Sequence, residues 1–428
     1  MKIKNWGRNL VFKPDQIIYP KTEQEIIQLV KKAGAANKKI RVIGTGHSWT
    51  PLVTTDDILV SMNNYQGIIE VDSISQTALV KAGTKLKLLG ELLFKERLAM
   101  ENLGDIDEQS IAGAISTGTH GTGIIFGTIS TQIIEMSFIN GKGEKITCSP
   151  KNNPAIFRAA QISLGALGII TEIRLRLVPA YNLKYEMRKG NLEETLNKLN
   201  IYKTENRNFE FYWFPHTMAV QLKFLNQVEE HPRNVGFAKT FNDVVVENGI
   251  FGLLSRISRA FPAFAPRISK ICGAAISNNI FVNHSHLIFA TKRLVKFYEM
   301  EYNIPAENFE AVIKEMVFSI NANKYRVHFP VECRFVRGDD ITISPANGRD
   351  SAYIAIHMYK GMEYERYFQA MEKIFRKYGG RPHYGKMNYF GKKDFEAAYP
   401  GWGEFMGIRQ EMDPGGVFLN PYLRSILV

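Results

Sequence analysis

The sequence predicts an α+β protein with two domains, and three observations lead to this. Short β-branched strands and amphipathic helices follow one another through the first 178 residues. Beyond Pro179 the chain changes to longer polar segments with many aromatic residues. A chain of 428 residues is long enough for two domains with separate cores. Its 45% hydrophobic and 22% charged residues are ordinary for a globular protein, so a disordered chain is excluded.

The elements of the first domain follow from the spacing of its apolar residues. A helix is expected over 22–34, where apolar residues recur at the helical period after Thr22. A second helix is expected over 86–97. Gly141 and Gly143 predict a hairpin between two of the strands. Strands bounded by turn residues are expected at 40–43, 58–61, 68–72, 77–81, 133–140, 144–148 and 169–178.

The strand at 40–43 leads into the most informative motif, Gly-Thr-Gly-His-Ser at residues 44–48. Its two glycines let backbone N–H groups face an anion, because no Cβ atom stands in the way. A Rossmann dinucleotide site needs a third glycine and then a helix, whereas Trp49 and Pro51 follow here. The motif therefore predicts a phosphate-binding loop that is not of the Rossmann type.

A second glycine-rich segment lies at 101–123, ENLGDIDEQSIAGAISTGTHGTG. Glycines and hydroxyl side chains at this density let the backbone pack flat against a large planar ligand and donate to its phosphates. The alternative is a surface loop rich in Gly, Ser and Thr. Ile106, Ile111 and Ile115 argue against a solvated linker. The segment is therefore predicted to form part of a ligand site.

Together the two segments resemble the vanillyl-alcohol oxidase family of flavoenzymes, and more narrowly its aldonolactone and alditol oxidases. The resemblance continues in the family's order through FEFYWFPHT (209–217), MEYNIP (300–305), ECR (332–334), AIHMY (355–359), RPHYGK (381–386) and DPGGVFLNPY (413–422). It implies a two-subdomain FAD-binding domain of the PCMH type over 1–178. It also implies an antiparallel-sheet cap domain over 179–390 and a C-terminal segment, 391–428, that returns to the FAD domain.

The resemblance further implies FAD bonded covalently through His47 to a methyl group of its dimethylbenzene ring. No cysteine lies near His120, where doubly linked relatives carry one, so one covalent bond is expected. Gly104 lacks a Cβ and would leave oxygen a path to the flavin that alanine narrows in a dehydrogenase relative. The other cofactor contacts that we expect are Arg41, Gly44, Thr45, Gly46, Ser48, Asp105, Ser110, Gly113, Ala114, Ser116, Thr117, Gly121 and Ile169.

Glu332 and Arg334 are the candidate catalytic pair. They stand two apart in a strand-like segment, 325–336, so their side chains share one face. From the residues alone, a structural ion pair is an equally good interpretation. The resemblance assigns Glu332 to the substrate hydroxyls and Arg334 to negative charge developing on the flavin or the alkoxide. It assigns Lys386 to the oxygen on the reacting carbon, where a cation lowers the cost of an alkoxide.

Two further residues bear on the substrate. His357, on an alternating strand at 353–359, faces either the substrate or a hydrogen-bonding partner in the core, and both interpretations stay open. Asp105 stands where alditol oxidases carry a serine that contacts substrate. A carboxylate there repels acidic substrates and accepts hydrogen bonds from a lactone or a polyol. The Asp-Ile-Asp-Glu run at 105–108 resembles the lactone-oxidase branch.

The expected reaction is therefore oxidation of D-arabinono-1,4-lactone or L-gulono- or galactono-1,4-lactone, with oxygen converted to hydrogen peroxide. Three alternatives remain. One is an alditol oxidase of the xylitol or sorbitol type, and the second is a lactone dehydrogenase that uses a quinone or a cytochrome. The third is a flavoprotein that tailors a larger sugar-bearing molecule.

The composition limits which binding partners and which cellular compartment we expect for the protein. Three widely spaced cysteines predict reduced thiols in a cytoplasmic protein, and the N-terminus has no apolar signal core. His284 and His286 alternate without a nearby carboxylate or cysteine, so no metal site is expected. The net charge of +12 is spread along the chain, which gives no reason to expect a nucleic-acid partner.

One segment, 250–279, has apolar residues interspersed with Arg256, Arg259, Arg267 and Lys270. Such a pattern is compatible with an anionic membrane surface. It is also compatible with a helical excursion of the cap domain whose cations point into water. The second interpretation is the preferred one.

Overall fold

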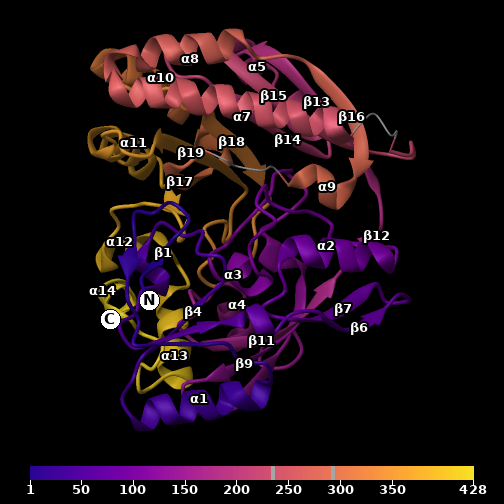
Figure 1. The fold of residues 1–428 in the computed structure, drawn as a ribbon, viewed down its shortest axis with the longest axis vertical. Helices are drawn as coiled ribbons and strands as arrows, with labels where there is room; N and C mark the ends of the chain where they lie inside the picture. The colour runs from indigo at the N-terminus through magenta and orange to yellow at the C-terminus, as the bar shows by residue number, and fades with distance from the viewer. Residues whose placement is uncertain (233–236, 291–294) are drawn as a thin grey trace.

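The computed structural model describes residues 1–232, 237–290 and 295–428, with residues 237–248 described by their backbone alone. It confirms the predicted α+β class, because helices pack against sheets that are mainly antiparallel. In Figure 1 the N-terminal elements, in indigo and purple, form the lower part of the molecule together with the yellow C-terminal helices. The elements coloured pink to brown form the upper part.

Two main sheets make up the lower part. A parallel sheet has the order β3-β5-β4, and an antiparallel sheet has the order β10-β9-β11-β7-β6. Five predicted strands are confirmed at their predicted bounds, and β9 and β10 form the predicted hairpin. The strands are β3 (Gln16–Ile18), β4 (Ile40–Ile43), β5 (Ile58–Ser61), β6 (Ile68–Asp72), β7 (Thr77–Lys81), β9 (Ile133–Asn140), β10 (Lys145–Cys148) and β11 (Gly168–Arg176).

The helices of the lower part agree with the sequence except near their ends. α1 (Glu23–Ala35) begins after Thr22, whose hydroxyl accepts a hydrogen bond from the Glu25 N–H at 3.2 Å. α2 (Leu86–Lys95) ends before the predicted residue, because Arg97 adopts a left-handed φ of 59° that a helix cannot continue. The other elements are β1 (Ile3–Lys4), β2 (Val11–Phe12), η1 (Pro51–Val53), η2 (Met62–Asn64), β8 (Leu98–Ala99), α3 (Ile111–Ser116), η3 (Ile129–Gln132) and α4 (Pro154–Gln161).

The predicted strand at 169–178 is in fact divided. β11 ends at Arg176, and β12 (Val178–Pro179) turns to pair with β8. The predicted boundary near Pro179 therefore falls just before β13 (Asn182–Asn191), the first strand of the upper sheet.

The upper sheet has eight antiparallel strands in the order β16-β13-β15-β14-β18-β19-β17-β20. One face is apolar: Tyr302, Ile354, Cys333 and Phe211 are successive cross-strand partners, all buried. α10 (Phe309–Asn323) and α11 (Glu365–Lys377) bury apolar side chains against this face. The strands are β14 (Asn208–Trp213), β15 (Ala219–Val228), β16 (Asn279–His284), β17 (Phe297–Pro305), β18 (Val331–Val336), β19 (Ser351–Tyr359) and β20 (Arg381–Pro382).

The C-terminal segment packs on the lower part of the molecule. The amide of Asn420 donates to the carbonyls of Pro51 and Thr54, each at 2.8 Å. Asp413 accepts hydrogen bonds from the N–H groups of Val417 and Phe418, which fixes the turn before the last helix. The helices are α12 (Lys392–Ala398), α13 (Trp402–Met412) and α14 (Pro421–Leu427).

The segment 250–279 is mainly helical, a feature that both interpretations of its sequence allow. α7 (Phe237–Ala260) is followed by η4 (Pro262–Phe264) and α8 (Ala265–Ala274). α7 and α8 run along the top of the molecule in Figure 1. The remaining helices of the upper part are α5 (Leu192–Asn197), α6 (Leu199–Glu205), α9 (Ser285–Phe289) and η5 (Ala306–Asn308).

A buried histidine beneath α7 predicts a pH-dependent stability. His328 is fully buried between the hydroxyls of Ser255 and Ser258, and burial lowers its pKa to about 4. The unfolded histidine has a pKa of about 6.5, so between these values the unfolded state binds a proton that the folded state does not. Stability is complete above the unfolded pKa and falls as the pH drops toward the folded value. At pH 5 the loss from one such histidine is on the order of 2 kcal/mol.

Thermal melting at pH 7 and pH 5 checks this expectation. The midpoint should fall at pH 5, and His328→Asn should lose part of that dependence while keeping a polar group between the two serines. An identical pH dependence in the variant would show that His328 does not titrate on unfolding.

Candidate active site

The loop at 44–48 lines a cavity whose wall also includes residues of α3 and of the segment 164–170. Its empty volume is about 890 Å³, including space open to solvent. The expected cofactor contacts that line this cavity are Arg41, Gly44, Thr45, Gly46, His47, Ser48, Ser110, Gly113, Ser116 and Thr117.

The backbone of this loop fits an anion. Within the described chain, no hydrogen bond joins the N–H groups of residues 45–48 to a protein acceptor. A Cβ added at Gly44 would lie 2.7 Å from the Ser110 hydroxyl, so the loop and the start of α3 approach closely only because glycine stands there. Gly46 has a φ of 68°, which disfavours other residues. These features suit the phosphates of a dinucleotide such as FAD.

Arg41 holds the walls of the cavity together. Its buried guanidinium donates to the carbonyls of Leu52, Leu164, Gly165 and Phe418 at 2.6 to 2.9 Å, and burial lowers its pKa to about 10. All three guanidinium nitrogens therefore bind backbone oxygens. Arg41 acts on the shape of the site and ties the C-terminal segment to it.

Two expected cofactor contacts point elsewhere. Ile169 is buried against α1, because neighbours on a strand face opposite sides, and Gly168 and Ile170 line the cavity in its place. Ala114 lies on the side of α3 that is buried in the core. Ala112 and Gly113, on another side of the same helix, line the cavity. The sequence predicted the right elements but the wrong side-chain directions at these two positions.

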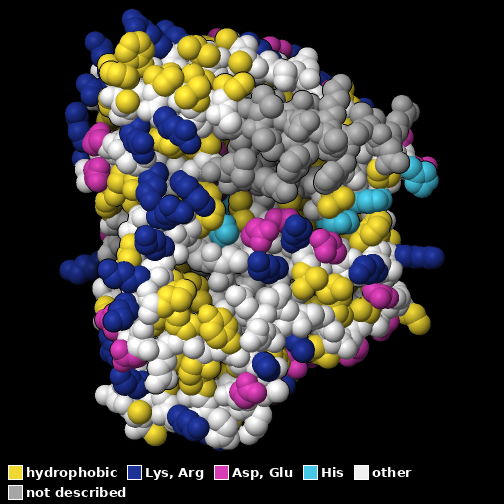
Figure 2. Space-filling view, viewed as in Figure 1, with side chains coloured by type: hydrophobic (Ala, Val, Ile, Leu, Met, Phe, Trp, Pro, Cys, Tyr) yellow, Lys and Arg dark blue, Asp and Glu magenta, His cyan; other side chains and the backbone are white. Residues whose placement is uncertain are grey.

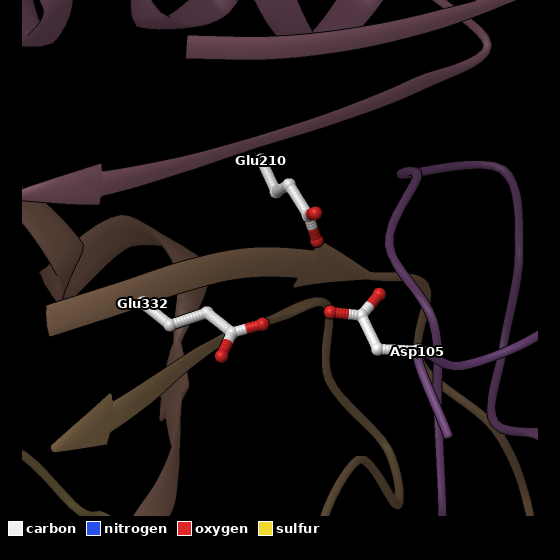
Figure 3. A group of neighbouring side chains, drawn as sticks. All are labelled: Asp105, Glu210 and Glu332. Carbon is white, nitrogen blue, oxygen red and sulfur yellow. The ribbon is translucent and has the colours of Figure 1, made fainter. Parts of the chain in front are cut away.

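A second group of functional side chains lies on the face of the upper sheet opposite the apolar one. Two adjacent rows of cross-strand partners are polar: Glu332 faces Tyr212, and Arg334 faces Glu210, which in turn faces Lys223. Figure 3 shows Glu210 and Glu332 from the sheet pointing toward Asp105, which comes from the glycine-rich segment. Oxygens of these three carboxylates lie within 4.8 Å of one another.

The protein's own cations lie among these carboxylates. Arg334 contacts all three: Asp105 at 2.7 Å, Glu210 at 2.8 Å, and Glu332. Lys223 lies 2.7 Å from Glu210 and 3.7 Å from Asp105. Although burial alone lowers the pKa of Lys223 and of Arg334, the carboxylates raise both, Asp105 most strongly. Both cations therefore stay charged at neutral pH.

Tyr212 completes this cluster. Its hydroxyl lies 3.1 Å from Glu332 and 3.3 Å from both Glu210 and Asp105. Burial, followed by the three carboxylates, raises its pKa well above the usual value. The phenol therefore keeps its proton and donates a hydrogen bond to a carboxylate.

Lys386 extends the polar face from Glu332 toward His47. Its ammonium lies 2.5 Å from Glu299, whose pKa burial alone would raise but which Lys386 and then His357 hold down to about 2. His357 is buried on this face: Nδ1 donates to the Pro330 carbonyl at 3.1 Å, and Nε2 lies 3.6 Å from Glu299 and 4.0 Å from Glu332. His357 is therefore a buried, hydrogen-bonded residue whose Nε2 points toward Glu299 and Glu332, and its contact with substrate stays a prediction.

His120 occupies the same face at its other side. Nε2 lies 3.2 Å from Glu301, and Nδ1 lies 2.8 Å from the Gly121 carbonyl, which can only accept a hydrogen bond. Burial would raise the pKa of Glu301, but His120 lowers it well below its usual range. His383 is also buried here, and burial lowers its pKa to about 4.

His47 lies where the cavity meets the polar face. Its Nδ1 is 2.8 Å from the Thr45 hydroxyl, and its ring stacks on Trp6 at 5.6 Å between centroids. Burial, then Lys386 and Lys296, lowers its pKa to about 4, so the imidazole is neutral at pH 7. The Trp49 N–H donates to the Gly385 carbonyl at 2.7 Å, which holds this loop beside Lys386.

Gly104 has a steric reason to be glycine. An added Cβ would lie 2.8 Å from the carbonyl oxygen of His120, so alanine would displace the backbone beside the His120–Glu301 pair. Alanine at this position would therefore disturb the packing around His120, whatever its effect on oxygen. Gly121 is equally confined, with a Cβ position 2.3 Å from the Leu103 carbonyl.

Sequence reasoning missed five members of this face. Glu210 and Tyr212 alternate with Phe209, Phe211 and Trp213, and Glu299 and Glu301 alternate with buried apolar residues in the same way. Carboxylates inside a strand that is buried on both faces are the signal that was available. The fifth member, Lys223, lies in the buried middle of β15, between the buried residues Leu222 and Phe224. His284 and His286 lie outside the site, beside Phe94 of α2.

Comparisons with known proteins agree with this geometry. The family described as "FAD binding domain" matches residues 14–149, and "D-arabinono-1,4-lactone oxidase" matches residues 173–426. An L-gulono-1,4-lactone dehydrogenase of Mycobacterium tuberculosis is 36% identical over 99% of this chain and 98% of its own. An L-gulonolactone oxidase of Bos taurus is 33% identical over 100% of this chain and 98% of its own.

Solved structures show the same fold at low sequence identity. A cholesterol oxidase of Brevibacterium sterolicum superposes with a TM-score of 0.80 at 18% identity and covers 100% of this chain and 97% of its own. At this identity the likeness concerns the architecture of a FAD-binding domain beside an antiparallel sheet.

Proposed function

The chain belongs to the family of FAD-dependent aldonolactone oxidases and dehydrogenases, and from this premise we propose that it oxidises a carbinol group of a sugar-derived 1,4-lactone. The observation that carries the proposal is the polar sheet face around Glu332 and Arg334. A buried charged face is a poor way to stabilise a sheet, since apolar residues of similar volume do so equally well or better. Its presence beside the cavity lined by the glycine-containing loop at 44–48 supports a catalytic role.

Five of the charged groups on this face have a role in the proposed reaction. FAD, when bound, supplies the hydride acceptor and passes the electrons to a second acceptor. Glu332 accepts a hydrogen bond from a substrate hydroxyl and keeps that hydroxyl oriented. Arg334 and Lys386 place positive charge where negative charge develops as the hydroxyl proton leaves. Glu299 holds Lys386 by an ion pair, and Glu210 holds Arg334 in the same way.

The charge of the site favours a lactone over the corresponding acid. On this polar face five carboxylates meet three cations, an excess of two carboxylates: Asp105, Glu210, Glu299, Glu301 and Glu332 against Lys223, Arg334 and Lys386. An aldonate would bring a further negative charge into a buried site, whereas its lactone is neutral. Among lactones, D-arabinono-1,4-lactone and L-gulono- or galactono-1,4-lactone are the proposed substrates, and neutral alditols are the second candidates.

Assays across these compounds test the proposal. Rates should be measured with the 1,4-lactones, with their hydrolysed aldonates, and with xylitol and sorbitol, each with oxygen and with an artificial acceptor. We expect the lactones to be oxidised and the aldonates to be at least tenfold poorer substrates. Faster oxidation of alditols than of every lactone would replace the lactone proposal with an alditol oxidase.

We further propose oxygen as the acceptor, with a dehydrogenase as the second candidate because the Mycobacterium relative carries that name. The Bos taurus relative is named an oxidase, which supports oxygen as the acceptor. Reduced enzyme mixed with aerated buffer should reoxidise rapidly, and catalase should return half of the oxygen consumed. Because alanine at Gly104 would displace His120, the wild-type rate is the informative quantity. Slow reoxidation in air with fast turnover on an artificial acceptor would favour the dehydrogenase.

A further inference from the structure

The surface formed by the end of α7, η4 and the exposed side of α8 has no role in the reaction described above. We name it the α7–α8 face and define it by the exposed side chains of Ile250, Leu253, Ile257, Phe261, Phe264 and Ile271. We propose that this face docks the protein on an anionic lipid surface. The proposal is independent of the substrate and of the acceptor.

The face is a continuous apolar stripe that points outward. Its members from Ile250 to Phe264 follow one another at spacings of three or four residues, the period of a helix face. All six side chains are between 40% and 62% exposed. A soluble surface helix normally buries its apolar stripe and exposes its polar residues.

The inner side of α7 carries Phe251, which packs on Phe329, together with two serines that fix the rotation of the helix. Ser255 and Ser258 are fully buried, and their hydroxyls bind the two ring nitrogens of His328 at 3.0 Å. Rotating the helix to bury Leu253 and Ile257 would break both hydrogen bonds and leave His328 unsatisfied in the core. The hydrogen bonds to His328 therefore hold the apolar stripe outward.

The charge around the stripe matches an anionic partner. Between Glu247 and Glu299 the sequence contains no Asp or Glu, and it contains seven Lys or Arg residues. Arg256 and Lys270 are exposed beside the stripe, and the Arg267 guanidinium lies 5.4 Å from the centre of the Phe264 ring. In Figure 2, hydrophobic side chains gather at the top of the view over α8, with Lys and Arg side chains at their border.

This combination favours a lipid surface over a second copy of the chain. Two copies that paired through this face would bring the cations of each against those of the other. A lipid surface accommodates both the apolar stripe and the cations. The apolar side chains can enter the boundary of the acyl chains while the cations contact the anionic headgroups. In the part of the chain that the structure describes, no helix has the length and apolar character to cross a bilayer. The contact proposed is therefore with the membrane surface.

Sedimentation with vesicles tests the proposal on the full-length, FAD-loaded protein. Vesicles of phosphatidylcholine alone are compared with vesicles that also contain phosphatidylglycerol, at low and at high salt. We expect binding to the anionic vesicles that weakens with salt. Arg256→Gln combined with Lys270→Gln should weaken binding about twenty-five-fold, at about fivefold for each cation removed. Leu253→Gln, Ile257→Gln and Phe261→Gln together should weaken it at least tenfold.

Matched controls separate this face from exposed apolar residues in general. Ile74 and Ile201 are equally or more exposed but lie on other surfaces, so Ile74→Gln with Ile201→Gln should bind like the wild type. Lactone oxidation in lipid-free buffer should be unchanged in every variant, which shows that each is folded; if the triple variant fails this check, Phe261→Gln alone replaces it. Absence of wild-type binding to anionic vesicles, or equal loss in the control, would overturn the proposal. So would a lipid-free dimer that the stripe variant converts to a monomer.

Discussion

Replacing Glu332 with glutamine, or Arg334 with methionine, is expected to slow reduction of the bound flavin by substrate at least about a hundredfold. Groups that stabilise charge only in the transition state commonly have effects of this size. Arg334 contacts three carboxylates, so its removal also leaves Asp105, Glu210 and Glu332 buried without their shared cation. Anaerobic stopped-flow mixing with the lactone measures the rate directly, without a contribution from oxygen.

Cys333 provides the matched control for this pair. It lies between Glu332 and Arg334 on β18, but its side chain is buried in the apolar face of the sheet. Cys333→Ala should therefore keep the reduction rate within a few-fold of the wild type while causing a similar local change of packing. Near-normal rates in both Glu332→Gln and Arg334→Met would leave the pair as a structural ion pair only.

Changing His47 to alanine is expected to abolish covalent attachment of the flavin. The imidazole is buried, and its pKa of about 4 keeps it neutral at pH 7, as a ring nitrogen requires to act as a nucleophile. After acid denaturation and electrophoresis, yellow fluorescence should stay with the wild-type polypeptide and leave the His47→Ala polypeptide. The variant should fold, bind FAD loosely and oxidise substrate slowly.

His284→Ala is the control for this second prediction, because His284 lies against Phe94 and away from the cavity. Its flavin should remain attached. If the wild-type protein released all of its flavin into the acid supernatant, His47 would line the cavity without bonding to the cofactor.

The sequence predicted local features well because their causes are local. The strand at 40–43 and the loop after it follow from β-branched residues that give way to glycines, and the structure has that strand at the predicted bounds. The shared face of Glu332 and Arg334 follows from the two-residue period of a strand. Short-range periodicity was sufficient in these cases.

What the sequence did not predict depends on contacts between distant segments. Glu210 and Lys223 are neighbours in a hairpin. They become part of the candidate site only through ion pairs with Arg334 of β18 and Asp105 of the glycine-rich segment. The direction of the α7 stripe is a similar case. Its period shows that one side of the helix is apolar, but only the buried Ser255–His328 hydrogen bond shows that this side faces outward.

The central claim is that a neutral sugar lactone delivers its hydride at this polar sheet face, and anaerobic reduction of the bound flavin tests it most directly. The wild-type protein is mixed without oxygen with L-gulono-1,4-lactone or D-arabinono-1,4-lactone, and separately with the hydrolysed aldonates. The account predicts rapid bleaching of the flavin absorbance by at least one lactone, at least tenfold slower bleaching by its aldonate, and loss of the rapid phase in Glu332→Gln. Rapid bleaching by a lactone that persists unchanged in Glu332→Gln and Arg334→Met, or no bleaching by any lactone, would contradict it.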